Sequence, residues 1–136
     1  MLHDVSRVFR KRIEQHSDLE VRLSAEQFTL LNAICCMEKE VIQKDLAEHT
    51  GKDKSAILRI IDTLEKKELV RRVVSVQDRR KNYLMVTKLG NRILEQHMAI
   101  VTELTGELSS GLIQEQIRIF NEVVSHIAES ARKLLS

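Results

Sequence analysis

The sequence predicts a mainly α-helical domain that contains one short β-hairpin. The 136 residues include no proline and only four glycines, so few positions interrupt a helix. Hydrophobic residues make up 43% of the chain and recur at helical spacing over most of its length. One stretch near the middle instead has two short β-branched runs, separated by five polar residues. At this length we expect a single domain that covers residues 1–136.

The first half of the chain is expected to form four helices. Apolar spacing predicts the first helix over residues 4–17. Ser24 and Gln27 have the spacing of a capping box, which starts a second helix. A short third helix is expected over residues 43–49, and a fourth over residues 54–67. The buried face of the second helix is predicted to consist of Phe28, Leu31, Ile34 and Cys35.

The junction between the third and fourth helices has the spacing of a helix-turn-helix. Gly51 suits a turn with positive φ, and Asp53 is a suitable N-cap for the fourth helix. Ala47, four residues before Gly51, is small enough for the two helices to touch, and Ile57, six residues after it, is an apolar anchor. The fourth helix should bury Ile57, Ile60, Ile61 and Leu64 and expose Lys54, Ser55, Leu58, Arg59 and Asp62.

The second half of the chain begins with the hairpin. Its strands are predicted over residues 71–76 and 82–86, and its tip reads Gln-Asp-Arg-Arg-Lys. Thr87 can then cap a long helix over residues 88–109, and Gly111 separates that helix from a last one. A basic hairpin directly after a helix-turn-helix is typical of a winged helix-turn-helix.

The charge distribution indicates a site for a polyanion. Residues 52–81 hold ten Lys and Arg against five Asp and Glu, a local charge of +5, whereas the whole chain carries +2. Proteins that bind single strands need exposed aromatic residues for stacking, and this chain has three Phe, one Tyr and no Trp. Double-stranded DNA is therefore the expected partner.

Together these motifs resemble the MarR family of bacterial transcriptional regulators. The resemblance is carried by the segments LSAEQFTLL, QKDLAEHTGKDKSAILRIIDTLEKKELVRR and DRRKNYLMVTKLG. It implies that Arg80 in the wing enters the minor groove of DNA and that Asp78 orients its guanidinium group. The DNA-binding residues that the resemblance and the helix pattern together predict are Lys52, Lys54, Ser55, Leu58, Arg59, Arg79, Arg80 and Lys81.

Three positions depart from the family pattern. Glu68 stands where the family usually has glycine, so we expect the end of the fourth helix to be capped differently. Ser75 stands where an acidic residue is common, and Leu58 occupies a position that is more often polar.

The terminal segments are expected to form a dimer interface. Their long apolar faces exceed what a chain of this size can bury alone. Residues 1–22 and 89–136 are therefore predicted to be a helical dimerisation region, and residues 23–88 the winged helix-turn-helix DNA-binding region. The resemblance implies an intertwined homodimer on a pseudo-palindromic operator, acting as a repressor that responds to a small aromatic or anionic effector.

No motif for catalysis, cofactor binding or metal binding is present. We expect neither an enzyme nor a cofactor, and the five histidines show no ligand spacing, so we interpret all of them as surface residues. Cys35 and its neighbour Cys36 cannot form a CxxC motif. Cys35 is interpreted as a small buried hydrophobic residue, so oxidation is not expected to be the switch.

Two further expectations concern location and alternative functions. The longest run without charge has eleven residues, and the N-terminus lacks a signal peptide, so the chain is expected to be cytoplasmic and not to contact a membrane. Two other interpretations stay open: a winged-helix module for protein–protein contact without DNA, and a cysteine-based redox-sensing regulator of the same fold.

Overall fold

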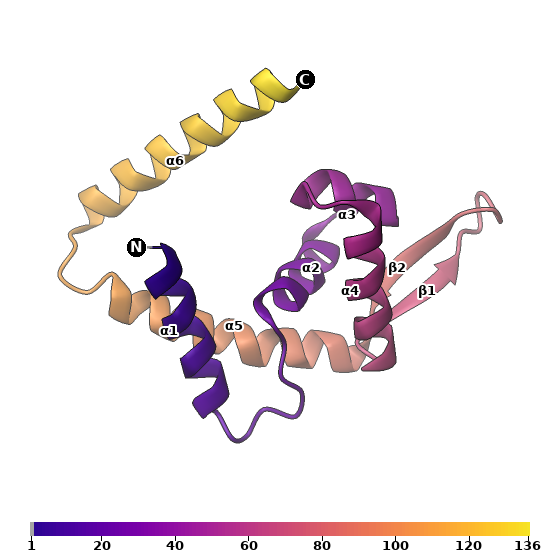
Figure 1. The fold of residues 1–136 in the computed structure, drawn as a ribbon, viewed down its shortest axis with the longest axis horizontal. Coiled ribbons are helices and arrows are strands. Elements are labelled where there is room, and N and C mark those ends of the chain that lie inside the picture. Colours follow the sequence, from indigo (N-terminus) through magenta and orange to yellow (C-terminus); the bar gives the residue numbers. More distant parts are fainter. Residues whose placement is uncertain (1) are drawn as a thin grey trace. The chain divides into compact units, whose positions relative to one another are not determined.

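The computed structural model describes residues 2–136 and has six helices and one two-stranded antiparallel sheet within that range (Figure 1). This confirms the predicted mainly helical fold with a single hairpin. Residues 2–104 and 105–136 form two compact units, which are described separately. In chain order the elements are α1 (Leu2–Gln15), α2 (Ala25–Cys36), α3 (Gln43–Thr50), α4 (Lys54–Lys66), β1 (Val70–Val74), β2 (Asn82–Val86), α5 (Lys88–Leu108) and α6 (Gln114–Leu135).

The predicted capping signals start the helices where the sequence places them. The backbone N–H of Gln27 donates to Ser24 Oγ at 3.2 Å, and the Ser24 N–H donates to Gln27 Oε1 at 3.0 Å. This reciprocal pair is the capping box of α2. Thr87 starts α5 in a related way, since its Oγ1 accepts the Gly90 N–H at 2.9 Å. Helix α1 begins and ends two residues earlier than predicted.

The hairpin is shorter on its first strand than predicted. Strand β1 ends at Val74, opposite Asn82, because Ser75 turns inward and is buried. An isolated antiparallel β-bridge also pairs Val41 with Leu84 of β2. In Figure 1 the hairpin projects outward beside α4, and its turn lies at the end away from α5.

The core of the first unit is built from α2, α3, α4, the hairpin and the start of α5. Fully burying a Leu or Ile side chain contributes about 1.5–3 kcal/mol, so this cluster holds the helix-turn-helix and the hairpin together. The side chains with at most 1% exposure include Leu30, Leu31, Leu46, Ile57, Ile61, Leu64, Leu69, Val70 and Ile93.

None of the helices within residues 2–136 combines the length and apolar character needed to cross a lipid bilayer.

The structure corrects the interpretation of Cys35. Leu30, Leu31, Ala33 and Ile34 form the buried face of α2, whereas Cys35 is exposed. Cys35 and Cys36 are the last two residues of α2, so they extend past the part of the helix that the core covers. Burial therefore gives Cys35 no protection from oxidants in this chain.

The interpretation of all five histidines as surface residues is wrong for His97. This side chain on α5 is fully buried, and its Nε2 accepts the Leu23 N–H at 3.1 Å. Its Nδ1 lies 2.9 Å from the Ile93 carbonyl oxygen and must carry the proton, because Nε2 is the acceptor. Burial is the main cause that lowers the pKa of His97. A neutral imidazole thus ties the segment before α2 to α5.

Candidate nucleic-acid interface

The turn between α3 and α4 has the geometry that the sequence predicts. Gly51 adopts φ 69°, and its N–H donates to the Ala47 carbonyl oxygen at 2.9 Å. The carboxylate of Asp53 accepts the Ala56 N–H at 2.7 Å, which makes Asp53 the N-cap of α4. This hydrogen bond is also the first cause that lowers the pKa of Asp53. The start of α4 is therefore held in place by a charged cap.

Helix α4 presents a polar face to solvent. Ile57, Ile61 and Leu64 are buried on its inner side. The predicted site residues on its outer side, Lys54, Ser55, Leu58 and Arg59, are all exposed. The structure thus brings these four side chains together on one accessible face.

Lys52 differs from the other predicted cations. Its Nζ lies 2.8 Å from Glu26 Oε1, and its side chain is only partly exposed. The hydrogen bond from Lys52 is also the first cause that lowers the pKa of Glu26. Ion pairs between exposed groups contribute about 0–1 kcal/mol, so a phosphate could replace Glu26 at little cost.

The tip of the wing is a closed turn. The Ser75 N–H donates to the Lys81 carbonyl oxygen at 2.9 Å, and the Lys81 N–H donates to the Asp78 carbonyl oxygen at 2.9 Å. Asp78 Oδ1 accepts the Arg80 backbone N–H at 3.1 Å and lies 3.5 Å from Arg80 Nε. The Arg80 side chain is 92% exposed, and Arg79 and Lys81 are exposed beside it.

Sequence reasoning did not predict the side-chain contacts that hold the wing against the rest of the domain. Ser75 is 5% exposed, its Oγ donates to the Glu40 carboxylate at 3.2 Å, and it accepts the Asp78 N–H at 3.4 Å. The departure of Ser75 from the family pattern was the one sequence signal for this contact.

Arg72 on β1 contacts Asp62 and Glu65 on α4, and these hydrogen bonds raise the pKa of Arg72. In the sequence, Arg72 counted only as part of the basic block.

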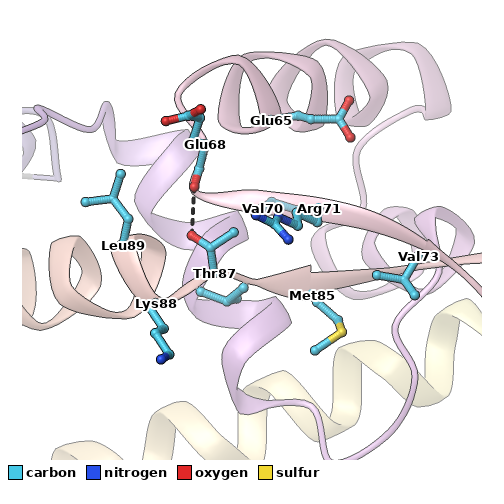
Figure 2. Close-up of a pocket in the computed structure, with 10 residues that line it drawn as sticks. Glu65, Glu68, Val70, Arg71, Val73, Met85, Thr87, Lys88 and Leu89 are labelled. Carbon is cyan, nitrogen blue, oxygen red and sulfur yellow. Dashed lines mark hydrogen bonds between the residues drawn. The ribbon is translucent and has the colours of Figure 1, made fainter.

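The expectation of a different cap at the end of α4 is wrong. Glu68 itself adopts φ 61°, the left-handed conformation that glycine favours. The Glu68 N–H donates to the Glu65 carbonyl oxygen at 2.9 Å, and the Leu69 N–H donates to the Leu64 carbonyl oxygen at 2.9 Å. Figure 2 shows Thr87 Oγ1 donating to the Glu68 carbonyl oxygen, at 2.7 Å. These bonds join the end of α4 to the base of the wing.

The winged helix-turn-helix matches known proteins in sequence and in fold. A sequence model of the MarR family matches residues 22–81. The fold is similar to that of *Staphylococcus aureus* MepR in a complex with DNA, at 21% identity and a TM-score of 0.77 over 95% of this chain and 89% of that one. *Streptomyces coelicolor* PcaV, solved with its natural ligand, gives 21% identity and a TM-score of 0.74 over 96% of this chain and 88% of that one. Wild-type *Escherichia coli* MarR in its apo form gives 26% identity and a TM-score of 0.71 over 93% of each chain. The family match spans the helix-turn-helix and most of the wing, and the fold agrees over nearly the whole chain, so residues 22–81 carry the sequence pattern of the MarR family and the chain has the winged helix-turn-helix fold of MarR-family transcriptional regulators.

Proposed function

We propose that this chain is a homodimeric repressor that binds a pseudo-palindromic operator in double-stranded DNA and releases it when a small ligand binds. Members of the family are transcriptional regulators rather than enzymes, which agrees with the expectation from the sequence. The observation that carries the proposal is the pairing of an exposed, polar α4 face with an exposed arginine at the wing tip. A module for protein contact alone would not need that basic wing.

In this proposal α4 reads base edges in the major groove. Lys54, Ser55 and Arg59 supply hydrogen-bond donors, and the exposed Leu58 suits apolar contact with a thymine methyl group. Lys52 contacts a phosphate after leaving Glu26. The MepR structure, which contains DNA, supports this use of the fold.

The wing is proposed to contact the minor groove beside it. Arg80 inserts its guanidinium group, which is weakly hydrated and suits the negative potential of a narrow minor groove. Asp78 orients Arg80, and Arg79 and Lys81 contact the phosphate backbone of the DNA. The contacts from Asp78 to both the backbone and the side chain of Arg80 support this assignment.

The terminal helices are proposed to form the homodimer. Among the described residues of α1 and α6, none is buried within the chain. Residues 1–22 and 89–136 would be the dimerisation region, and residues 23–88 the DNA-binding region. Sedimentation should give twice the chain mass of 15.7 kDa. The exposed apolar side chains on α6 include Ile119, Phe120, Val123, Val124 and Ile127.

A cavity between α1 and the start of α2 is a candidate effector site. Its volume is about 740 Å³, and it is lined by the apolar side chains of Phe9, Ile13 and Leu23, by the cations Arg10 and Arg22 and by the carboxylates Glu14 and Glu26. The apolar walls fit a small aromatic ring, and Arg10 and Arg22 offer guanidinium groups for a carboxylate on that ring, in a lining whose charges otherwise balance. The PcaV structure, which holds that protein's natural ligand, supports a ligand-responsive role. Such a ligand acts only through its different affinities for the DNA-bound and free conformations.

The test is a gel shift of the wild-type protein with the DNA flanking its own gene, repeated over a salt titration. Arg80→Ala should cost about 1–3 kcal/mol in binding and lower the salt slope by about one. Asp78→Ala should weaken binding too, although it removes a negative charge. Asp78→Asn keeps the acceptor for the Arg80 N–H and removes only the charge, so it should lie between Asp78→Ala and wild type.

Simple charge attraction predicts the opposite order for the aspartate variants. If Asp78→Ala binds DNA more tightly than wild type, Asp78 does not orient Arg80. If the wild-type protein shows no shift above its affinity for unrelated duplex DNA, the proposed sequence-specific regulation is wrong. In the same assay, aromatic carboxylates that release no DNA at any concentration tested would count against the effector site.

A further inference from the structure

One side chain connects the wing to the DNA-facing surface of α4. Arg72 lies on β1, opposite Leu84 in the hairpin register. Its Nη2 donates to Asp62 Oδ1 at 2.7 Å, and its Nη1 donates to Glu65 Oε1. The two arms of one planar guanidinium group thus bind two different carboxylates three residues apart on α4, which restricts its rotation as well as its position.

The two carboxylates continue the outer face of α4. Asp62 lies four residues after Leu58 and seven after Ser55, so helical spacing places all three on the same side of the helix. From Arg72 the strand runs two more residues, to Val74, before the wing loop begins. The contact therefore lies between the proposed base-reading residues and the wing tip.

We propose that Arg72 is a positioning residue that fixes the angle between α4 and the wing, so that both can enter their grooves of one DNA duplex. This inference rests on the proposed DNA-binding function and adds a residue that does not touch DNA. Side-chain exposures of 29% for Arg72, 47% for Asp62 and 39% for Glu65 place the contact at the surface, where its loss leaves the core intact. Without it, the hairpin can pivot at its base, and Arg80 no longer reaches its groove when α4 is seated.

Arg71 is a matched control on the same strand. Successive side chains of a strand point to opposite faces, so Arg71 points away from the face that carries Arg72. It is exposed and lines the hollow drawn in Figure 2, together with Val73 and Met85. Arg71→Gln and Arg72→Gln remove the same charge from neighbouring positions, and only Arg72→Gln removes the contact with α4.

The first experiment is a double-mutant cycle between Arg72 and Arg80, measured with the duplex DNA flanking the chain's own gene. In the wild-type background, Arg80→Ala should weaken binding by about 5- to 150-fold. In the Arg72→Gln background the same change should weaken it less than threefold, because the wing is already misplaced. In the Arg71→Gln background Arg80→Ala should keep its full effect. Equal effects of Arg80→Ala in all three backgrounds would overturn the inference.

The second experiment removes the partners of Arg72 instead. The variant Asp62→Asn with Glu65→Gln removes two negative charges beside DNA, so charge attraction alone predicts tighter binding. If Arg72 positions the wing through these carboxylates, the double variant should instead lose at least threefold in DNA affinity, and Arg80→Ala should have a smaller effect in it. Tighter binding with an unchanged effect of Arg80→Ala would show that the contact does not position the wing.

A third measurement needs no DNA. Spin labels at Lys66 on α4 and Val76 in the wing, with Cys35 and Cys36 replaced by serine, report the distance between the two elements. Arg72→Gln should broaden that distance distribution, whereas Arg71→Gln should leave it as in wild type; an unchanged distribution in both contradicts the inference. A broadened distribution in a protein that binds no DNA would instead show that the proposed function is wrong while the structural role of Arg72 holds.

Discussion

Replacing Glu68 by glycine should stabilise the folded chain by about 0.5–1 kcal/mol. Glu68 holds φ at 61°, and the left-handed conformation costs a residue with a β-carbon about 1–2 kcal/mol. Glycine removes this cost but adds about 0.4–1 kcal/mol of backbone entropy to the unfolded state. The hydrogen bonds at this position use the backbone N–H and carbonyl oxygen of residue 68, including the bond that Thr87 Oγ1 donates to the Glu68 carbonyl oxygen. Glycine has the same backbone groups, so these bonds are retained.

The assay is thermal and urea unfolding at one fixed protomer concentration, because a dimer makes apparent stability depend on concentration. For a chain of this size the gain corresponds to a rise in Tm of about 2–4 °C. Glu68→Ala is the matched control, since it removes the same carboxylate and keeps the β-carbon. It should stay within about 0.5 kcal/mol of wild type. If Glu68→Ala and Glu68→Gly are equally stable, backbone strain at this position is not the cause and the reasoning fails.

Two further predictions concern the packing and the buried imidazole. A β-carbon at Gly90 would lie 2.2 Å from the Leu69 carbonyl oxygen and 2.7 Å from Val86 Cγ1. Gly90→Ala should therefore destabilise the chain by about 3 kcal/mol in urea unfolding. Gly106→Ala, whose β-carbon would meet nothing within 4 Å beyond its chain neighbours and the backbone of its own helix, should instead stabilise the chain by about 0.5–1 kcal/mol. The folded-state pKa of His97 is lowered from 6.5, so the unfolded chain binds more protons and stability falls as the pH drops below 6.5. His97→Gln should be less stable at neutral pH and lose less between pH 7 and about pH 5; an identical pH dependence of the two proteins would exclude His97 as the titrating group.

The elements of this fold follow from signals that act over a few residues. Ser24 with Gln27, Gly51 with Asp53, and Thr87 each specify a helix end by hydrogen bonds within three or four positions. Such bonds join residues that are close in sequence and do not depend on which distant elements meet, so sequence spacing alone is sufficient to predict them. The exposed face of α4 and the basic wing tip follow in the same way from helical and hairpin periodicity.

Only the tertiary structure decided which distant groups meet. His97 accepts the N–H of a residue 74 positions away, and Ser75 donates to Glu40, 35 positions away. Arg72 and Lys52 belong to one basic block in the sequence, yet each is paired with acidic residues of a different helix. The spacing of residues along the chain does not predict these contacts, because they depend on how α2, α4, the hairpin and α5 pack around the core. The sequence therefore determined the winged helix-turn-helix and its cations, and the packing determined which of those cations remain exposed and which one links the wing to α4.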